Sequence, residues 1–396
     1  MKILHFADLH IGYENYGKVD DKTGLNSRLL DFLKAFDKII DYALTHKIGL
    51  VIFAGDAYKT RDPSPTYQRE FSKRLKKLAS KIPTVLITGN HDIPPSYGKA
   101  DTLEIFPILE VPNVYVFSKP EVRDINGVQI VALPWILKSS ALKEDERKKS
   151  IEKVREILSG RISEIFKELV SKIKPAKPAI AVVHQSVTGA VFASSQDTYI
   201  GNDPLISAQT LANPKISYVA LGHLHKYQVL NEDPPVIYSG SIERIDFGEE
   251  SEEKGFVVAD INPGQKTKWQ FIQLAARKFK TINIQVPEKE NKPSDFVKKE
   301  IKKADIKDAV VRIVIHGREE MLARILESDI REATKSASYI ASVSKKSEKK
   351  VVKIEINSED YTPMDWLSKY LEYKQFKKDQ SKLIKETAQQ LMEELT

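Results

Sequence analysis

The sequence predicts an α/β protein, and three observations indicate this class. Short apolar runs of three to five residues occur along the first two thirds of the chain, and such runs are typical of strands buried on both faces. Between them lie longer segments in which apolar residues recur every three or four positions, as in amphipathic helices. Five of the apolar runs are followed by Asp, Asn or His residues, at the point where α/β sheets place their ligands.

The helical and strand-like patterns can be placed in order along the chain. We expect helices at residues 25–46, 68–80 and 151–173, with Asn26 as the N-cap of the first and a break or kink at Gly160 in the third. Strand-like runs at 236–238, 255–258 and 268–274 then complete a first domain of residues 1–275. These runs alone do not separate a single doubly wound sheet from two packed sheets.

The remaining 120 or so residues predict a smaller second unit and a helical tail. Within residues 277–357, strand-like runs at 281–286 and 310–315 are accompanied by helical patterns at 294–303 and 319–332. The polar segment 344–350 is typical of a loop or hairpin tip. Residues 358–396 follow as a tail with an apolar helical stripe, which needs either a surface of its own chain or a partner.

Composition excludes several classes of protein. The chain has no cysteine, which rules out disulfides, thiolate zinc sites and cysteine nucleophiles. No apolar stretch approaches the roughly 18 residues of a membrane span and no leader pattern is present, so we expect a cytoplasmic protein without a membrane partner. The net charge of +7 lies mainly in residues 271–350, which indicates either a polyanion-contacting surface or a solvated lysine-rich face.

The residues that follow the five apolar runs predict a binuclear metal site. They are Asp8 and His10, Asp56, Asn90, His184, and the pair His223 and His225. Asp56 is the carboxylate best placed to bridge two ions, and a mixed nitrogen and oxygen set suits Mn, Fe, Co or Zn better than a dedicated Mg or Ca cage. Two ions about 3.5–4 Å apart would clamp a phosphate and activate water. The alternative interpretation, core histidines and turn carboxylates, requires five motifs to coincide by chance.

The same motifs resemble the signature of calcineurin-like metallophosphoesterases. Within that superfamily, residues 2–12 and 238–249 resemble the SbcD/Mre nucleases of DNA double-strand-break repair, and the likeness covers residues 1–275 well. The resemblance implies two packed β-sheets flanked by helices, a smaller α+β DNA-capping domain at 277–357, and a helical tail at 358–396. It also implies that the tail binds the coiled-coil base of an SbcC/Rad-type ATPase.

The resemblance further implies a role for each residue of the site. One ion would be held by Asp8, His10, Asp56 and His225, and the other by Asp56, Asn90, His184 and His223. His91 matches the non-ligand catalytic histidine, and Asp92 would either orient it or cap a turn. Lys59 stands where family members often carry histidine or a carboxylate, so a second catalytic group in that loop is in doubt.

We expect DNA contacts on the loops beside the predicted metal site and within residues 277–357. The candidates are Asn15, Tyr16, Lys59, Arg61, Ser241, Arg244, Lys302 and Lys303, although Arg244 and Asp246 could equally form an internal ion pair. The expected cofactors are two Mn²⁺, with Mg²⁺, Co²⁺, Fe²⁺ or Zn²⁺ as alternatives. The resemblance also implies a homodimer, for which Leu29, Leu33 or Leu75 would supply the contact.

The leading hypothesis is a two-metal DNA nuclease and the nuclease subunit of a complex with an SMC-like ATPase. It would act as a 3′-to-5′ exonuclease on duplex ends and as an endonuclease on single strands or hairpins. Two alternatives stay open: a phosphatase or phosphodiesterase on the same core, and a DNA-end-binding scaffold with little activity. The basic region 277–357, the tail and residues 239–249 argue against a phosphatase or phosphodiesterase. The complete ligand set argues against a scaffold.

Overall fold

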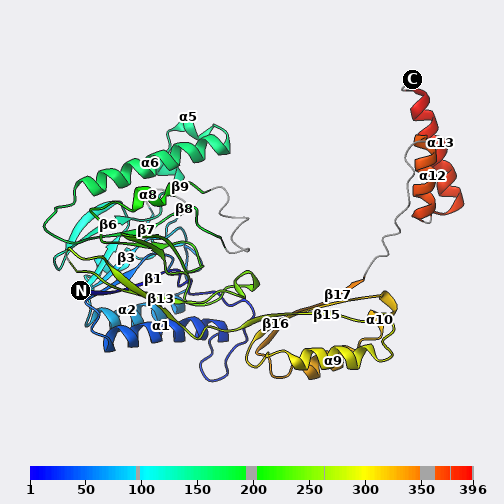
Figure 1. Ribbon diagram of the computed structural model, residues 1–396, viewed down its shortest axis with the longest axis horizontal. Helices are drawn as coiled ribbons and strands as arrows, with labels where there is room; N and C mark the ends of the chain where they lie inside the picture. Colours follow the sequence, from blue (N-terminus) through cyan, green and yellow to red (C-terminus); the bar gives the residue numbers. More distant parts are fainter. Residues whose placement is uncertain (95–98, 193–202, 263, 348–361, 375, 395–396) are drawn as a thin grey trace. The chain divides into compact units, whose positions relative to one another are not determined.

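The computed structural model describes residues 1–94, 99–192, 203–262, 264–347, 362–374 and 376–394 (Figure 1). The chain divides into two compact units, Met1–Ser347 and Glu348–Thr396. Within the described ranges, no helix combines the length and the apolar character needed to cross a membrane.

Two six-stranded sheets form the centre of the first unit. The first has the order β14-β13-β1-β2-β3-β4, from β1 (Lys2–Phe6), β2 (Leu50–Phe53), β3 (Thr84–Ile87), β4 (Val114–Phe117), β13 (Gly255–Asp260) and β14 (Lys268–Gln273). The second has the order β11-β12-β10-β7-β6-β5, from β5 (Glu121–Ile125), β6 (Val128–Leu133), β7 (Ala179–His184), β10 (Tyr218–Gly222), β11 (Gln228–Glu232) and β12 (Pro235–Tyr238). In each sheet four neighbouring strands are parallel, β1 to β4 in one and β12-β10-β7-β6 in the other.

The two sheets pack face to face, and helices cover their outer faces. Ile52 and Val85 of the first sheet share one buried cluster with Val182 and Ala220 of the second. Helices α1 (Ser27–Thr45) and α2 (Pro65–Ala79) pack on the outer face of the first sheet, and α6 (Ile151–Ser171) and α8 (Ala208–Leu211) pack on that of the second. The expectation of two packed sheets flanked by helices is therefore confirmed. Smaller elements join these layers: α3 (Ile105–Ile108), α4 (Lys138–Ala141), α5 (Glu144–Arg147), β8 (Ser186–Thr188), β9 (Leu205–Ser207) and the 3₁₀ turn η1 (Phe247–Glu249).

The main helices follow their sequence patterns, with one correction. Asn26 caps α1, since its side chain accepts a hydrogen bond from the Arg28 N–H, as predicted. Helix α6 continues through Gly160 without a break. Leu158 and Ile162 are both buried on either side of that glycine, so packing of the apolar face overrides the low helix propensity of glycine.

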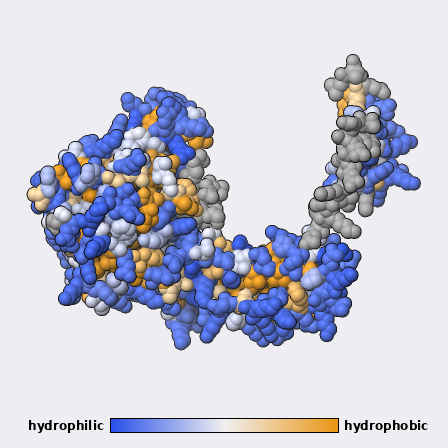
Figure 2. All heavy atoms as spheres, in the orientation of Figure 1, coloured by the Kyte–Doolittle hydropathy of each residue, from blue (hydrophilic) through white to orange (hydrophobic). Residues whose placement is uncertain are grey.

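A third, three-stranded parallel sheet lies in residues 279–347. It consists of β15 (Phe279–Gln285), β16 (Val310–Gly317) and β17 (Tyr339–Ser347), with α9 (Pro293–Lys303), α10 (Glu319–Ala323) and α11 (Glu327–Ala333). These elements have a core of their own, in which Val297 and Ile301 of α9 meet Ile313 and Ile315 of β16. Figure 2 shows apolar side chains over this sheet, bordered by hydrophilic ones.

Two expectations for this region were wrong. The pattern at 319–332 predicted one helix, but the chain forms two, because Leu322, Ile325 and Ile330 all turn toward the core. The polar segment that begins at Ser344 was expected to be a loop, but β17 continues to Ser347 by pairing with β16. Backbone pairing with a neighbouring strand outweighs the polar composition here. The remainder of that segment, 348–350, and the expected boundary at 357 lie outside the described residues.

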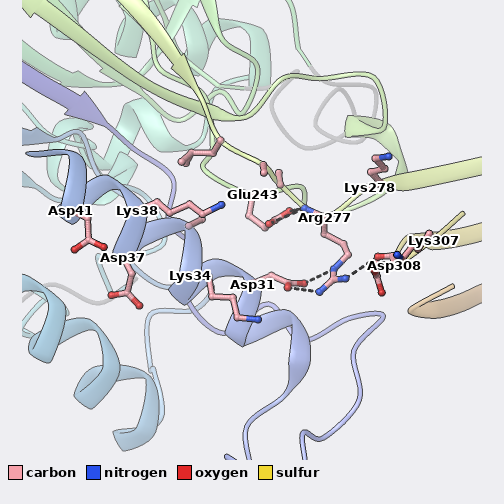
Figure 3. A pocket seen from close by; sticks show the side chains of 14 residues that line it. Asp31, Lys34, Asp37, Lys38, Asp41, Glu243, Arg277, Lys278, Lys307 and Asp308 are labelled. Carbon is pink, nitrogen blue, oxygen red and sulfur yellow. Dashed lines mark hydrogen bonds and ion pairs between the residues drawn. The ribbon is translucent and has the colours of Figure 1, made fainter. Parts of the chain in front are cut away.

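Ion pairs fix the connection between the third sheet and the rest of this unit. Arg277, just before β15, makes two hydrogen bonds to the Asp31 carboxylate of α1 and one to the Asp308 carbonyl (Figure 3). Its backbone N–H donates to Glu243, 2.8 Å away. Thr281 of β15 is bound in the same way by the Glu250 carboxylate. Residues 243–250 therefore hold both the linker and the first strand of the third sheet.

The second unit contains the two helices α12 (Pro363–Tyr373) and α13 (Lys378–Glu394). Thr362 and Asp365 form a capping box that begins α12. Several large apolar side chains of these helices and their connection are exposed: Trp366, Tyr370, Tyr373, Phe376, Leu383, Leu391 and Met392.

The expected dimer residues are not on the surface, and this generates a stability prediction. Leu29, Leu33 and Leu75 all lie in the core between the first sheet and its helices, so they cannot form the contact between two copies.

We expect Leu33→Ala to lower the free energy of unfolding by about 2–5 kcal/mol, because it leaves a cavity at a position only 2% exposed. Ile151→Ala, at a position 63% exposed, is the control and should change it by about 0.5 kcal/mol or less. Denaturant unfolding of both variants measures this, and equal small losses would contradict it.

Candidate metal centre

The structure brings the seven expected ligands together at the carboxyl ends of five parallel strands. Strands β1, β2 and β3 of the first sheet lead to Asp8, His10, Asp56 and Asn90, and strands β7 and β10 of the second lead to His184, His223 and His225. Six of the seven side chains are buried and Asn90 is half-buried. Three groups of side chains have ligand atoms within 4.8 Å of one another: Asp8, His10 and His225; His10, Asp56 and His91; and Asp56, His184 and His223.

Four of these residues have a backbone conformation that L-amino acids rarely adopt. The φ angles of Asp8, His10, Asp56 and His223 are +53°, +43°, +61° and +100°. Each such residue costs on the order of 1–3 kcal/mol and persists only where its surroundings enforce it. Here backbone hydrogen bonds between the loops do so, from Asp8 N–H to the Gly55 carbonyl and from His10 N–H to the Asp56 carbonyl, both 3.0 Å. Strain of this kind clusters at functional sites.

Two glycines allow the ligand loops to approach one another. A Cβ at Gly89 would lie 2.1 Å from Asp56 Oδ1, and a Cβ at Gly222 would lie 2.0 Å from the Ala54 carbonyl oxygen. Neither contact is tolerable, so glycine is required at both positions. Gly89 directly precedes Asn90 and Gly222 directly precedes His223, so the two glycines provide space for the ligands that follow them.

The side-chain nitrogens of His184 and His223 converge on the side-chain oxygen of Asn90. His184 Nδ1 donates to the Ala54 carbonyl at 2.7 Å, which leaves Nε2 aimed at Asn90 Oδ1 (3.2 Å) and Asp56 Oδ2 (3.5 Å). His223 Nδ1 lies 3.0 Å from the same Asn90 oxygen. Burial alone would lower the pKa of His184, but the Asp56 carboxylate more than offsets it and raises that pKa to about 9. A positive charge therefore belongs between these atoms, as a proton or as a cation.

A second convergence involves His10 and His225. Their Nε2 atoms face each other at 3.0 Å, and His10 Nε2 lies 3.6 Å from Asp56 Oδ2. The buried Nδ1 of His10 has no hydrogen-bond partner among the described residues. With the Asp8 carboxylate, these two imidazoles have ligand atoms within 4.8 Å of one another, a set suited to a divalent transition metal. Asp56 joins the two convergences, through His10 in one and through His184 in the other, so the residues would fit two cations with that carboxylate between them.

His91 lies at the edge of this site with one ring nitrogen already fixed. Its Nδ1 donates to the Lys59 carbonyl at 2.8 Å, and its ring meets that of His10 edge-on at 4.9 Å between centroids. Its backbone N–H donates to Asp56 Oδ1 at 2.9 Å. The half-buried Nε2 is then the atom that remains for proton exchange.

Asp92 has a structural contact set and does not touch His91 by any hydrogen bond in the described residues. Its fully buried carboxylate accepts from the N–H groups of Asp56, Ala57 and Gly89 at 2.9–3.0 Å. It therefore joins the loop after β2 to the loop after β3. Of the two roles expected for Asp92, catalytic orientation and turn capping, its contacts correspond to the second.

The candidates for DNA contact on the loops beside the metal centre differ in their exposure. Asn15 and Arg61 are exposed, and Arg61 Nε donates to the Asn90 carbonyl at 3.2 Å. The Lys59 ammonium lies over the Tyr13 ring, 4.7 Å from its centroid, next to the His91 contact. Tyr16 packs edge-on against Phe247, Phe279 and Tyr339, so its ring belongs to an aromatic cluster beside the third sheet.

Two expected DNA contacts are corrected, Ser241 by its burial and Arg244 by its internal hydrogen bonds. Ser241 is fully buried and donates to the Glu243 carbonyl, so it cannot reach a nucleic acid. Arg244 donates to the carbonyls of Glu249, Glu252 and Arg277, which commits its guanidinium to the fold. Asp246 instead caps η1 through the Gly248 N–H, so the alternative of an Arg244–Asp246 pair is also wrong. Lys302 and Lys303 are exposed on α9, although Lys303 pairs with Glu300.

Three residues near the ligands were not found by sequence reasoning. The Glu249 carboxylate lies 2.7 Å from His225 Nδ1, and Asp203 lies 3.0 Å from His223 Nε2. Lys254 is fully buried and pairs with Glu249 and Glu252. Glu249 stands in the stretch 238–249 that resembles the nucleases, which is a signal that could have drawn attention to it, whereas Asp203 follows no motif.

Comparisons with known proteins agree with this geometry. The family model described as calcineurin-like phosphoesterase matches residues 1–227. The chain is 27% identical over 290 residues to the D subunit of the nuclease SbcCD from Bacillus subtilis (strain 168), covering 70% of this chain and 71% of that protein. It is 26% identical over 290 residues to the DNA double-strand break repair protein Mre11 of Thermoplasma acidophilum, covering 72% and 66%.

Solved structures are similar at lower levels. A dimetal phosphatase from Danio rerio is 12% identical with a TM-score of 0.38, over 66% of this chain and 93% of that one. A 5′-nucleotidase precursor from Thermus thermophilus is 13% identical with a TM-score of 0.37, over 69% and 54%. The family match spans more than half of the chain and contains the ligands from Asp8 to His225. The chain therefore belongs to the calcineurin-like phosphoesterase family.

Proposed function

We propose that this protein is a two-metal DNA nuclease of double-strand-break repair. The observation that carries the proposal is the pair of ligand groups that share the Asp56 carboxylate, one with His10 and the other with His184 and His223. Phosphodiester hydrolysis needs a phosphate held in place, an activated water and a proton for the leaving oxygen. Two divalent cations, with Mn²⁺ favoured, would supply Lewis acidity and the activated water when bound.

The residues of the chain supply the rest of the chemistry. Asp8, His10, Asp56, Asn90, His184, His223 and His225 hold the cations. His91 is anchored through Nδ1 to the Lys59 carbonyl, so its Nε2 gives a proton to the leaving 3′ oxygen of the sugar. Arg61, exposed and bound to the Asn90 carbonyl, is placed to meet a phosphate beside this site.

DNA is favoured as substrate over a small phosphomonoester for two reasons. The curated relatives at 26–27% identity include a nuclease subunit and a double-strand break repair protein by name. A basic surface lies on and next to α9, formed by the exposed side chains of Lys299, Lys302 and Lys307. Within the described residues, none of these three lysines forms an ion pair. Such a surface binds phosphates without sequence preference, which an enzyme acting on any duplex end or single strand requires. We propose 3′-to-5′ exonuclease action on ends and endonuclease action on single strands or hairpins.

Two partner surfaces are part of the proposal. The exposed aromatic and aliphatic side chains of α12 and α13 bind the coiled-coil base of an SMC-like ATPase of the SbcC/Rad type. A homodimer forms through α3, where Ile105, Ile108 and Leu109 are 50–71% exposed, instead of through the buried leucines of α1 and α2.

The central prediction concerns metal dependence and His91. With Mn²⁺ we expect hydrolysis of linear duplex DNA and of single strands, and complete loss of both with EDTA, because the ligand side chains cannot act without cations. His91→Asn should reduce turnover roughly 10²–10⁴-fold, the usual contribution of general acid catalysis, while both Mn²⁺ still bind. Gel assays of cleavage and Mn²⁺ titration of the same samples measure the two effects. Turnover of small phosphomonoesters alone would identify a phosphatase, and DNA binding without any turnover would identify a scaffold.

The basic surface of the third sheet generates a prediction about DNA affinity. Charge reversal at Lys302 and Lys303 should weaken DNA binding and reduce the slope of log affinity against log salt by roughly 0.9 for each phosphate that is no longer bound. Metal content should stay unchanged. Lys172→Glu, on the exposed end of α6, serves as the matched control and should leave the slope unaltered. Binding curves over a range of salt concentrations decide this, and an unchanged slope in the double variant would leave the lysines as a solvated face.

The tail generates the third prediction of this section. The tail belongs to the compact unit Glu348–Thr396, whereas the metal centre belongs to the unit Met1–Ser347. Deletion of 358–396 should therefore not disturb the ligands. We expect this deletion to abolish association with the ATPase while metal-dependent hydrolysis of short single strands continues at the full-length rate. Co-purification and a cleavage assay on the same protein measure both. Loss of hydrolysis in the truncated chain would show instead that the tail supports the nuclease core.

A further inference from the structure

We propose that two carboxylates outside the ligand set, Glu249 and Asp203, are positioning residues that orient His225 and His223, one for each cation. The inference deepens the proposed metal centre and rests on it. It concerns which ring nitrogen each histidine presents to its cation. Neither carboxylate belongs to the motifs from which the ligands were predicted.

The contact of Glu249 with His225 is short and buried. Glu249 Oε1 lies 2.7 Å from His225 Nδ1, and both side chains are 10% exposed or less. The Nδ1–H of His225 therefore donates to this carboxylate, and Nε2 keeps its lone pair. That Nε2 is the atom facing His10 Nε2 at 3.0 Å, in the group formed with Asp8. Glu249 thus sets the tautomer in which His225 presents Nε2.

The contact of Asp203 with His223 has the opposite sense. Asp203 Oδ2 lies 3.0 Å from His223 Nε2, so here Nε2–H is the donor and Nδ1 keeps the lone pair. That Nδ1 faces Asn90 Oδ1 at 3.0 Å, in the group with Asp56 and His184. Two histidines only two residues apart therefore present different nitrogens. The position of the carboxylate partner accounts for the difference, because a ring can offer a lone pair only from the nitrogen that is not protonated.

Glu249 is itself held by a fully buried lysine. Lys254 Nζ lies 2.8 Å from Glu249 Oε2 and 2.8 Å from Glu252 Oε2. It also donates to Ser241 Oγ and to the carbonyl of His225. The Ile245 N–H adds a further hydrogen bond to Glu249 Oε2 at 3.1 Å. One oxygen of Glu249 is thereby fixed by the fold, and the other is aimed at His225. This division of contacts is what a positioning residue requires, since a mobile carboxylate would not select a tautomer.

Metal titration of the full-length protein tests the proposal. The chain is stripped with EDTA, the chelator is removed, and Mn²⁺ binding is followed by calorimetry and by the electron paramagnetic resonance signal of free Mn²⁺. Wild type should bind two Mn²⁺ per chain. Glu249→Gln and Asp203→Asn should each keep one ion with wild-type affinity and bind the other roughly 10–100-fold more weakly, the usual effect of removing such a partner. The double variant should lose affinity for both ions.

Controls separate this inference from the function on which it rests. Glu252→Gln removes the other carboxylate of Lys254 without touching a ligand, and it should bind two Mn²⁺ as wild type does. Thermal unfolding of the metal-free variants identifies any variant that fails to fold. If Glu249→Gln fails to fold, Asp203→Asn, at the edge of the site, still provides the test. Failure of wild type to bind two ions would overturn the proposed function. If wild type binds two ions and both single variants bind them with unchanged affinity, only the role of the carboxylates is overturned. The same follows if the double variant still binds one ion with wild-type affinity.

Discussion

The structure depends above all on placing one buried carboxylate, that of Asp56, between ligands from two separate sheets. Its Oδ2 lies 3.6 Å from Nε2 of His10, which follows β1, and 3.5 Å from Nε2 of His184, which ends β7. A charge in this position is costly unless it is paired and hydrogen-bonded. The surrounding loops meet that requirement, since the His91 N–H donates to Asp56 Oδ1 and the imidazoles of His10 and His184 lie beside Oδ2. The glycines at 89 and 222 and the left-handed backbone at the ligands are consequences of bringing so many polar groups this close.

The segment from Ser239 to Glu252 connects this centre to the third sheet. Glu249 contacts His225 at one end, while Glu243 and Glu250 bind the backbone of Arg277 and Thr281 at the other. Arg28 of α1 joins the same network through Asp31. Buried ion pairs of this kind contribute little net stability compared with apolar packing, but losing one partner is severe because the other charge is left unpaired. Their main effect is to fix the direction in which the chain leaves the metal centre toward the basic surface of α9.

The sequence was sufficient to predict which candidate ligands lie together, and insufficient to predict the carboxylates that contact them. Asp8, Asp56, Asn90 and His184 follow apolar runs, and a run of buried strand residues is visible without any knowledge of neighbours. Glu249 and Asp203 meet their histidines across 24 and 20 residues, through loops whose path no periodicity reveals. The burial of Ser241 and the internal hydrogen bonds of Arg244 were missed for the same reason, since polar residues on a loop are expected to be exposed until packing is known. Strand β17 was cut short because its polar end pairs with β16 regardless of composition.

The arrangement of the ligands also links metal binding to the packing of the sheets. Asp8, His10, Asp56 and Asn90 come from the first sheet, and the three remaining histidines come from the second, whose outer face has a separate core. A cation held by both sets would join the two sheets at the carboxyl ends of their strands, beside the apolar cluster that the sheets share. Binding to the folded state alone adds stability that grows by about 1.4 kcal/mol for each tenfold excess over the dissociation constant. The same cations that supply the chemistry therefore also offset the backbone strain and the burial of charge that their site imposes on the apo chain.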